Sequence, residues 1–163
     1  MEVHDLNDAF ILEMQDMLGA EKQILKGLQK MIDSASNDDL KAAFERHYDQ
    51  TERQIGRIEQ AFEAIDRSPQ SKHCDGIAGI IEEGEEAIEE AGEPHVRDAM
   101  LIASAQKVEH YEVATYGTLC TWGKVLGFDR AVELLKENLG EEKHTDDKLT
   151  QLSQQINRQA QPA

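Results

Sequence analysis

Apolar residues recur at intervals of three and four along most of the chain, which is the period of an amphipathic α-helix. In the first such segment the repeat includes Phe10, Met14, Met17, Ile24 and Leu28. The same period predicts helices over residues 5–33, 38–67, 77–91, 94–126 and 129–158. Four of these helices are long, each about 45 Å at 1.5 Å per residue, and the third is short.

Short polar segments separate the predicted helices. The turn SASNDD (34–39) contains Asn37 and Asp38, either of which can cap the second helix. The stretch SPQSKHCDG (68–76) is a predicted loop, and Pro94 suits the first turn of the fourth helix. We therefore expect a single all-α domain over residues 1–163. It is a four-helix bundle with a short fifth helix in the long second connection, the topology of ferritin-like proteins.

Five acidic residues interrupt the apolar faces of three long helices. Glu21 lies near the middle of the first face, and Glu112 is central in the fourth predicted helix, with Glu109 beside it. Glu142 and Asp146 share the apolar face of the last helix. An unpartnered buried carboxylate is costly. Several carboxylates that meet inside a bundle therefore imply bound metal, and their number predicts two ions.

The second long helix offers a weaker signal. Its apolar face passes through His47 and Thr51, whereas Glu52 lies on the flank. A di-iron bundle usually places a glutamate here with a histidine three residues later, and this helix has no such pair at the matching position. We expect either His47 or Glu52 to be its ligand, and the spacing does not choose between them.

The residue types suit an iron or manganese site. Carboxylate oxygens are hard donors that can bridge two ions, and imidazole completes such a coordination sphere. Two adjacent ions can then cooperate in a redox or hydrolytic step. We expect two iron ions, with manganese as the alternative. Glu112 and Glu142 are the expected bridging ligands, and Glu21, Glu109 and Asp146 the terminal ones.

Composition narrows the classes of partner. The chain has 33 acidic and 17 basic residues and a formal charge of −16, which argues against binding nucleic acid or an anionic membrane. No stretch approaches the length of an apolar membrane span, and the N-terminal segment has no secretory signal pattern. Cys74 and Cys120 lack metal-binding or redox spacing. A cytoplasmic location is the expectation.

Three segments carry a family resemblance: DMLGAEKQIL (16–25), VRDAMLIASAQKVEHYEVATYGTL (96–119) and LLKENLGEEKHTDDKLTQL (134–152). They closely resemble the YciF/YciE family (DUF892) of ferritin-like proteins, and the likeness extends over nearly the whole chain. It implies a carboxylate-bridged dinuclear site, a bacterial cytoplasmic location, a link to general stress responses, and a homodimer.

The resemblance also assigns ligands by position. Glu21 belongs to its AEKQ string, Glu109 and Glu112 to QKVEHYE, and Glu142 and Asp146 to EExxTD. The string HYDQTE (47–52) departs from the ExxH pattern of the broader ferritin-like group. The contribution of the second helix therefore stays open between its histidine and its glutamate.

Two functions follow as hypotheses. In the first, a dinuclear metal protein oxidises Fe(II) with dioxygen or consumes peroxide. In the second, a non-catalytic bundle acts in the stress response through a protein partner, and its metal site is empty or holds one structural ion. The glutamate-rich face of the short helix would then be the docking surface: Glu82, Glu83, Glu85, Glu86, Glu89 and Glu90.

Overall fold

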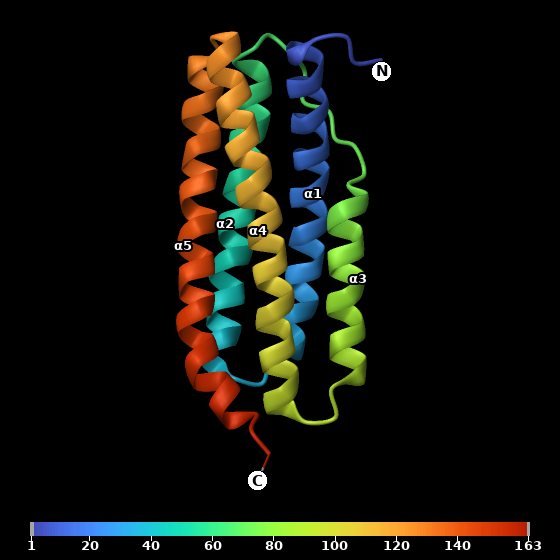
Figure 1. Ribbon diagram of the computed structural model, residues 1–163, viewed down its shortest axis with the longest axis vertical. Coiled ribbons are helices and arrows are strands. Elements are labelled where there is room, and N and C mark those ends of the chain that lie inside the picture. The colour runs from blue at the N-terminus through green and yellow to red at the C-terminus, as the bar shows by residue number, and fades with distance from the viewer. Residues whose placement is uncertain (1, 163) are drawn as a thin grey trace.

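Residues 2–162, which the computed structural model describes, form five α-helices and no β-strand (Figure 1). The helices are α1 Leu6–Ser34, α2 Asp38–Glu63, α3 Asp75–Glu90, α4 Pro94–Leu126 and α5 Asp129–Gln159. The prediction of an all-α fold with one short helix is confirmed. No helix within these residues has the length and apolar character needed to cross a membrane.

The four long helices lie side by side along the long axis of the molecule. In Figure 1, α1 and α2 form one hairpin and α4 and α5 form another. Helices α2 and α4 run in the same direction, so the chain must return along the bundle between them. Helix α3 lies in this return and packs against α1 and α4. This is the long-crossover arrangement of ferritin-like bundles.

Side chains define the turn between α1 and α2. Asn37 caps α2, since its Oδ1 accepts hydrogen bonds from the backbone N–H groups of Asp39 (3.0 Å) and Leu40 (3.1 Å). The carboxylate of Asp98, buried in the first turns of α4, accepts from the N–H groups of Ser36 (2.8 Å) and Asn37 (2.9 Å). The beginning of the second hairpin is thereby attached to the turn of the first.

Helix α2 ends at Glu63, earlier than the apolar spacing predicts. Phe62 and Ile65 continue the helical period, but Asp66 adopts a positive φ of 55°. The N–H of Arg67 donates to the carbonyl of Phe62 (3.0 Å), as in a helix C-terminal motif. A residue in the left-handed conformation cannot continue a right-handed helix. The spacing of apolar residues gives no information about this backbone conformation, so it could not predict where α2 ends.

Apolar side chains of all five helices form one core. This apolar core is interrupted near the midpoints of the four long helices, where several buried side chains are polar. Helix α4 contributes two of the carboxylates in this layer, more than any other helix, whereas α2 contributes three polar side chains and no carboxylate. The buried polar residues of the layer are Glu21, His47, Thr51, Gln54, Glu109, Glu112, Asn138 and Glu142.

The connection between α2 and α3 crosses directly over α1. The N–H of Lys72 donates to the carbonyl of Gln15 (2.9 Å). The side chain of Gln23 forms two hydrogen bonds with the backbone of Cys74, at 2.8 and 3.0 Å. A Cβ atom placed on Gly19 would lie 1.6 Å from the carbonyl oxygen of Lys72. Glycine is therefore required where the loop meets the helix.

We expect Gly19→Ala to destabilise the fold. Alanine favours a helix by up to about 1 kcal/mol, but displacing the loop should outweigh that gain and leave a net loss of roughly 1–3 kcal/mol. The control is Gly140→Ala, an exposed helical position with no atom within 4 Å of the added Cβ. Urea unfolding should show a loss of stability in the first variant and a gain in the second. An equal gain of stability in both variants would contradict the close approach of the Lys72 carbonyl oxygen to Gly19.

Candidate metal centre

Four buried side chains from three helices gather at the midpoint of the bundle. They are His47 of α2, Glu109 and Glu112 of α4, and Glu142 of α5. Each offers a ligand atom, and these atoms all lie within 4.8 Å of one another. The three glutamates are fully buried and the histidine is 3% exposed. Such a group could hold a metal ion.

Glu21 brings a carboxylate from α1 to the same layer. It is fully buried, and its Oε1 accepts a hydrogen bond from the hydroxyl of Tyr116. It also interacts with the carboxyl group of Glu112. Its other oxygen, Oε2, makes no hydrogen bond within residues 2–162. All four long helices therefore supply a possible ligand.

The donor atoms of the cluster are poorly satisfied by the protein. Among the described residues, both oxygens of Glu109 and Glu112 and both ring nitrogens of His47 are buried without a hydrogen bond. The imidazole Nδ1 lies 3.2 Å from Glu109 Oε1, and Nε2 lies 3.5 Å from Glu142 Oε2, but neither contact has hydrogen-bond geometry. Buried polar atoms are normally paired. Unpaired oxygen and imidazole donors that converge on one point fit coordination of a hard or borderline cation.

Neutral polar groups support the ligands. The amide of Gln54 donates to Glu142 Oε1. Asn138 Nδ2 donates to the hydroxyl of Tyr116 (2.9 Å) and to the backbone carbonyl of Gln54 (3.3 Å). Tyr116 in turn donates to Glu21. One hydrogen-bonded chain thus runs from the ligand of α5 to the ligand of α1, and such contacts orient metal ligands.

An ion pair lies behind this chain. The guanidinium of Arg57 binds both carboxylate oxygens of Glu141, at 2.8 and 2.9 Å. The same guanidinium donates to Asn138 Oδ1 (3.0 Å), so it determines which way the amide of Asn138 points. Bidentate pairs of this kind are geometrically specific, and here the pair joins α2 to α5.

Burial and mutual repulsion shift the acidity of the cluster. Burial, together with the nearby Glu142 carboxylate, raises the pKa of Glu21 to about 8. The pKa values of Glu109 and Glu112 are raised well above the usual range, first by burial and then by neighbouring carboxylates. Burial also opposes ionisation of Glu142, but interactions with His47, Glu109 and Gln54 outweigh it and lower its pKa. A cation entering the site would displace protons from the raised groups.

Five of the seven sequence candidates meet in this layer: Glu21, His47, Glu109, Glu112 and Glu142. Glu52 is exposed and lies outside the cluster. It follows the buried Thr51 by one residue, which rotates its side chain about 100° around α2. Of the two alternatives for α2, the structure places His47 at the site.

Asp146 also lies outside the group, although it was expected among the ligands. It follows Glu142 by one helical turn and has a shorter side chain. Its Oδ1 accepts from Gln106 Nε2 (3.0 Å), and its Oδ2 lies 3.2 Å from His110 Nε2. The side chain is 24% exposed. These contacts hold it at the flank of α4 rather than at the centre.

Sequence reasoning missed Gln54 and Asn138. Each was detectable, since Gln54 follows His47 by seven residues on the same helix face and Asn138 precedes Glu142 by four. A search for ionisable groups passes over neutral amides, although an amide on an apolar face also needs a partner.

The fold and the site together define a class of protein: ferritin-like helical bundles with a carboxylate and histidine cluster at the midpoint. The chain belongs to the family described as Domain of unknown function (DUF892), whose profile matches residues 5–161. The resemblance found in the sequence is thereby confirmed.

Relatives match over nearly their whole length. Protein YciF from Escherichia coli strain K12 is 44% identical over 163 residues, which span 99% of this chain and 98% of that protein. The crystal structure of the E. coli stress protein YciF superposes with a TM-score of 0.92 at 44% identity, covering 96% of this chain and 99% of that one. YcfI from Rhodopseudomonas palustris gives a TM-score of 0.90 at 40% identity, covering 91% and 95%.

A protein from Xanthomonas campestris pv. campestris shares the fold at low identity. Its TM-score is 0.73 at 16% identity, and the alignment covers 93% of each chain. At this identity the likeness concerns the architecture of the bundle alone.

The raised pKa values predict a pH dependence for the metal-free protein. Between about pH 5 and 8 the unfolded chain has released the Glu21 proton while the folded chain retains it. The free energy of unfolding should therefore fall as pH rises, by up to about 1.4 kcal/mol per pH unit for each such group. Urea unfolding in excess chelator at several pH values measures this.

The matched variants are Glu21→Gln and Glu52→Gln. The first removes one of the retained protons and should make the decline shallower. The second alters an exposed carboxylate and should leave it unchanged. A stability independent of pH across this window would contradict the raised pKa values.

Proposed function

We propose that the cluster binds two divalent ions, iron or manganese, and that the site oxidises Fe(II) or consumes peroxide. The observation that carries the proposal is the burial of four glutamates, Glu21, Glu109, Glu112 and Glu142, in one layer. When ionised they carry four negative charges, which equal the positive charge of two divalent ions. A single divalent ion would leave two uncompensated charges in the core, at a large desolvation cost.

The contacts support distinct roles for the ligands. Glu112 interacts with Glu142, Glu21 and Glu109 alike, so its central place suits a bridging carboxylate. Glu142 approaches His47 and Glu109, and we propose it as the second bridge. Glu21 and Glu109 would be terminal ligands, and the imidazole of His47 would bind one of the ions.

The chemistry would come from the bound pair. Two Fe(II) ions supply the two electrons that, with two protons, reduce dioxygen to hydrogen peroxide or reduce peroxide to two waters. The chain itself excludes bulk water by burying every proposed ligand. Gln54 and Tyr116 hold Glu142 and Glu21 in place by hydrogen bonds.

Relatives support a biological setting. The E. coli relative is called a stress protein, and we propose a stress-related role for this chain on that likeness. The homodimer and the cytoplasmic location remain predictions of the family resemblance.

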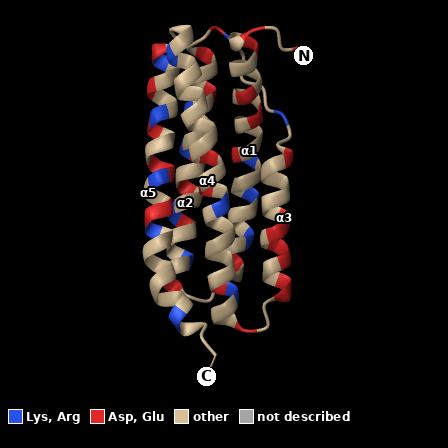
Figure 2. Ribbon diagram, in the orientation of Figure 1, with Lys and Arg blue, Asp and Glu red and all other residues tan. Residues whose placement is uncertain are grey.

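The competing hypothesis, docking of a basic partner on α3, has weaker support. Figure 2 shows acidic residues gathered along this helix. Two of them already have partners within the chain, because Glu85 pairs with Lys30 and Glu83 pairs with Lys107. The face is therefore partly neutralised by α1 and α4, and the rest is an ordinary solvated helix surface.

Metal content tests the proposal. Protein loaded with Fe(II) or Mn(II) and then desalted should retain two ions per chain by elemental analysis. Glu112→Ala and Glu142→Ala should each lose at least one ion, since each removes a bridging donor. Glu52→Ala, an exposed change on α2, should retain both. Equal content in all variants would refute the ligand assignment, and no retained metal in any of them would favour the partner-binding hypothesis.

Oxidation of the bound metal tests the reaction. Protein loaded anaerobically with Fe(II) should develop ferric absorbance in a stopped-flow instrument when mixed with dioxygen or peroxide. The rate should exceed that of Glu112→Ala by at least about tenfold, because loss of a bridging ligand disturbs both ions. Wild-type and variant rates that both equal that of free Fe(II) would contradict a redox function.

A further inference from the structure

Three hollows on the α3 side of the bundle follow one another toward the cluster. The outer one is an open groove of about 490 Å³ between α1 and α3. Beneath it lies a cavity of about 30 Å³, and deeper still one of about 20 Å³. Gly27 and Ile81 line all three hollows. Met31 and Val108 line both inner cavities, so these two adjoin each other.

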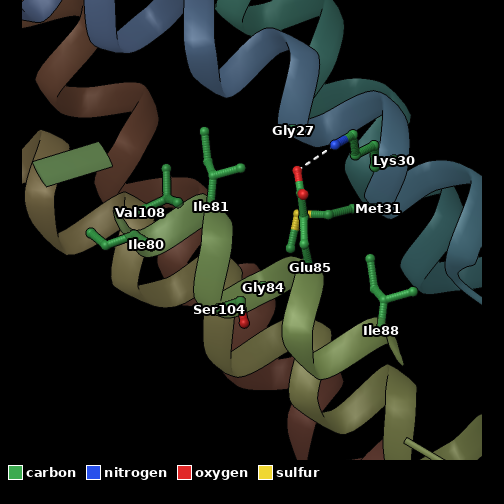
Figure 3. Close-up of a pocket in the computed structure, with 10 residues that line it drawn as sticks. All are labelled: Gly27, Lys30, Met31, Ile80, Ile81, Gly84, Glu85, Ile88, Ser104 and Val108. Carbon is green, nitrogen blue, oxygen red and sulfur yellow. Dashed lines mark hydrogen bonds and ion pairs between the residues drawn. The ribbon is translucent and has the colours of Figure 1, made fainter. Parts of the chain in front are cut away.

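The middle cavity has apolar walls (Figure 3). The side chains of Met31, Ile80, Ile81, Ile88 and Val108 surround it. Across its outer edge, the carboxylate of Glu85 on α3 pairs with the amine of Lys30 on α1. Both side chains of this pair are about half exposed, so the pair lies between the cavity and solvent.

The inner cavity ends at two of the proposed ligands. His47 and Glu109 line it together with apolar residues such as Ile24, Leu28 and Ala105. No nitrogen or oxygen atom faces the cavity itself. The ring nitrogens of His47 and the carboxylate oxygens of Glu109, which lack hydrogen bonds, belong to the side chains that line its inner end. The apolar hollow therefore ends against the side chains that carry the unsatisfied ligand atoms.

We propose that these hollows form an apolar passage through which dioxygen reaches the metal centre from the α1–α3 groove; this inference rests on the proposed function. Dioxygen is small and apolar and loses little on leaving water, whereas peroxide and metal cations would lose their hydrogen bonds or hydration among these walls. A cavity needs only about 10–15 Å³ to hold one water-sized molecule, and apolar cavities bind apolar gases.

A second cavity beside His47 has a mixed lining. It lies between α2 and α5, measures about 40 Å³, and has polar and basic side chains in its wall as well as apolar ones: Arg46, Gln50, His144, Thr145 and Lys148 beside Ala43, Phe44 and Leu149. The histidine thus lies between a hollow with basic side chains in its wall and the apolar one. Peroxide and other polar reactants have a route on this side that does not involve Gly27. Blocking the apolar passage should therefore affect dioxygen selectively.

Gly27 lines all three hollows, so a side chain added at this position would narrow the passage. A Cβ atom built on Gly27 would lie 3.4 Å from Ile81 Cγ1 and 3.5 Å from Cδ1, which is contact without a clash. Gly27→Ala therefore fills space in the passage while favouring helix α1. The matched control is Gly79→Ala, an exposed change on α3 with no atom within 4 Å of its Cβ.

Xenon-pressurised crystals and stopped-flow kinetics test the passage together. Wild-type and Gly79→Ala crystals should hold xenon beside Ile81 and Val108, and Gly27→Ala crystals should lose it. With Fe(II) bound, oxidation by dioxygen should be several-fold slower in Gly27→Ala than in the other two proteins. Oxidation by peroxide should be the same in all three, at equal metal content.

Any one of three results would contradict the proposed passage. The first is the absence of xenon from wild-type crystals. The second is a rate of oxidation by dioxygen that neither Gly27→Ala nor the larger Gly27→Leu changes, and the third is equal slowing of oxidation by dioxygen and by peroxide. Each of these leaves the proposed function intact if two ions are still bound per chain. Failure of the proposed function is a separate result, namely that the wild-type protein retains no metal. In that case the cavities would lead to no metal centre, even if they bind xenon.

Discussion

Repulsion among buried carboxylates is the constraint around which the middle of this bundle is organised. Glu21, Glu109, Glu112 and Glu142 come from three helices and share a layer from which water is excluded. Such a layer is stable only with protons, hydrogen-bond donors or cations between the charges. The amide of Gln54 and the hydroxyl of Tyr116 supply hydrogen-bond donors, but most of the carboxylate oxygens remain unsatisfied by the described residues. The core at either end of the layer is ordinary apolar packing.

Much of this arrangement could be predicted from the sequence, because a charged residue on an apolar stripe is conspicuous. Glu21 and Glu142 fall on such stripes, and helical geometry alone places them inside the bundle. The family resemblance supported the same positions. The end of α2 could not be predicted, since it depends on the backbone conformation of Asp66 rather than on any pattern of side chains.

What the sequence left open depends on contacts between helices. The choice between His47 and Glu52 follows from the rotation of α2 in the bundle. The place of Asp146 follows from two residues of α4 that hold it at the flank. The hollows around Gly27 lie where α1, α3 and α4 meet, with α2 at the inner end, and the residues that line them are far apart in the chain. Periodicity within one helix carries no information about such spaces.

The attachments of α3 limit how the molecule can move. Near its N-terminus, Gln23 of α1 holds the backbone of Cys74 by two hydrogen bonds. Beyond its C-terminus, Asp98 holds the α1–α2 turn by two more. Between these points, the pairs Lys30–Glu85 and Lys107–Glu83 tie the middle of α3 to α1 and α4. A helix attached near its start, at its middle and just beyond its end cannot swing away as a hinged flap, so its apolar face, which includes Ile81, stays over the interior.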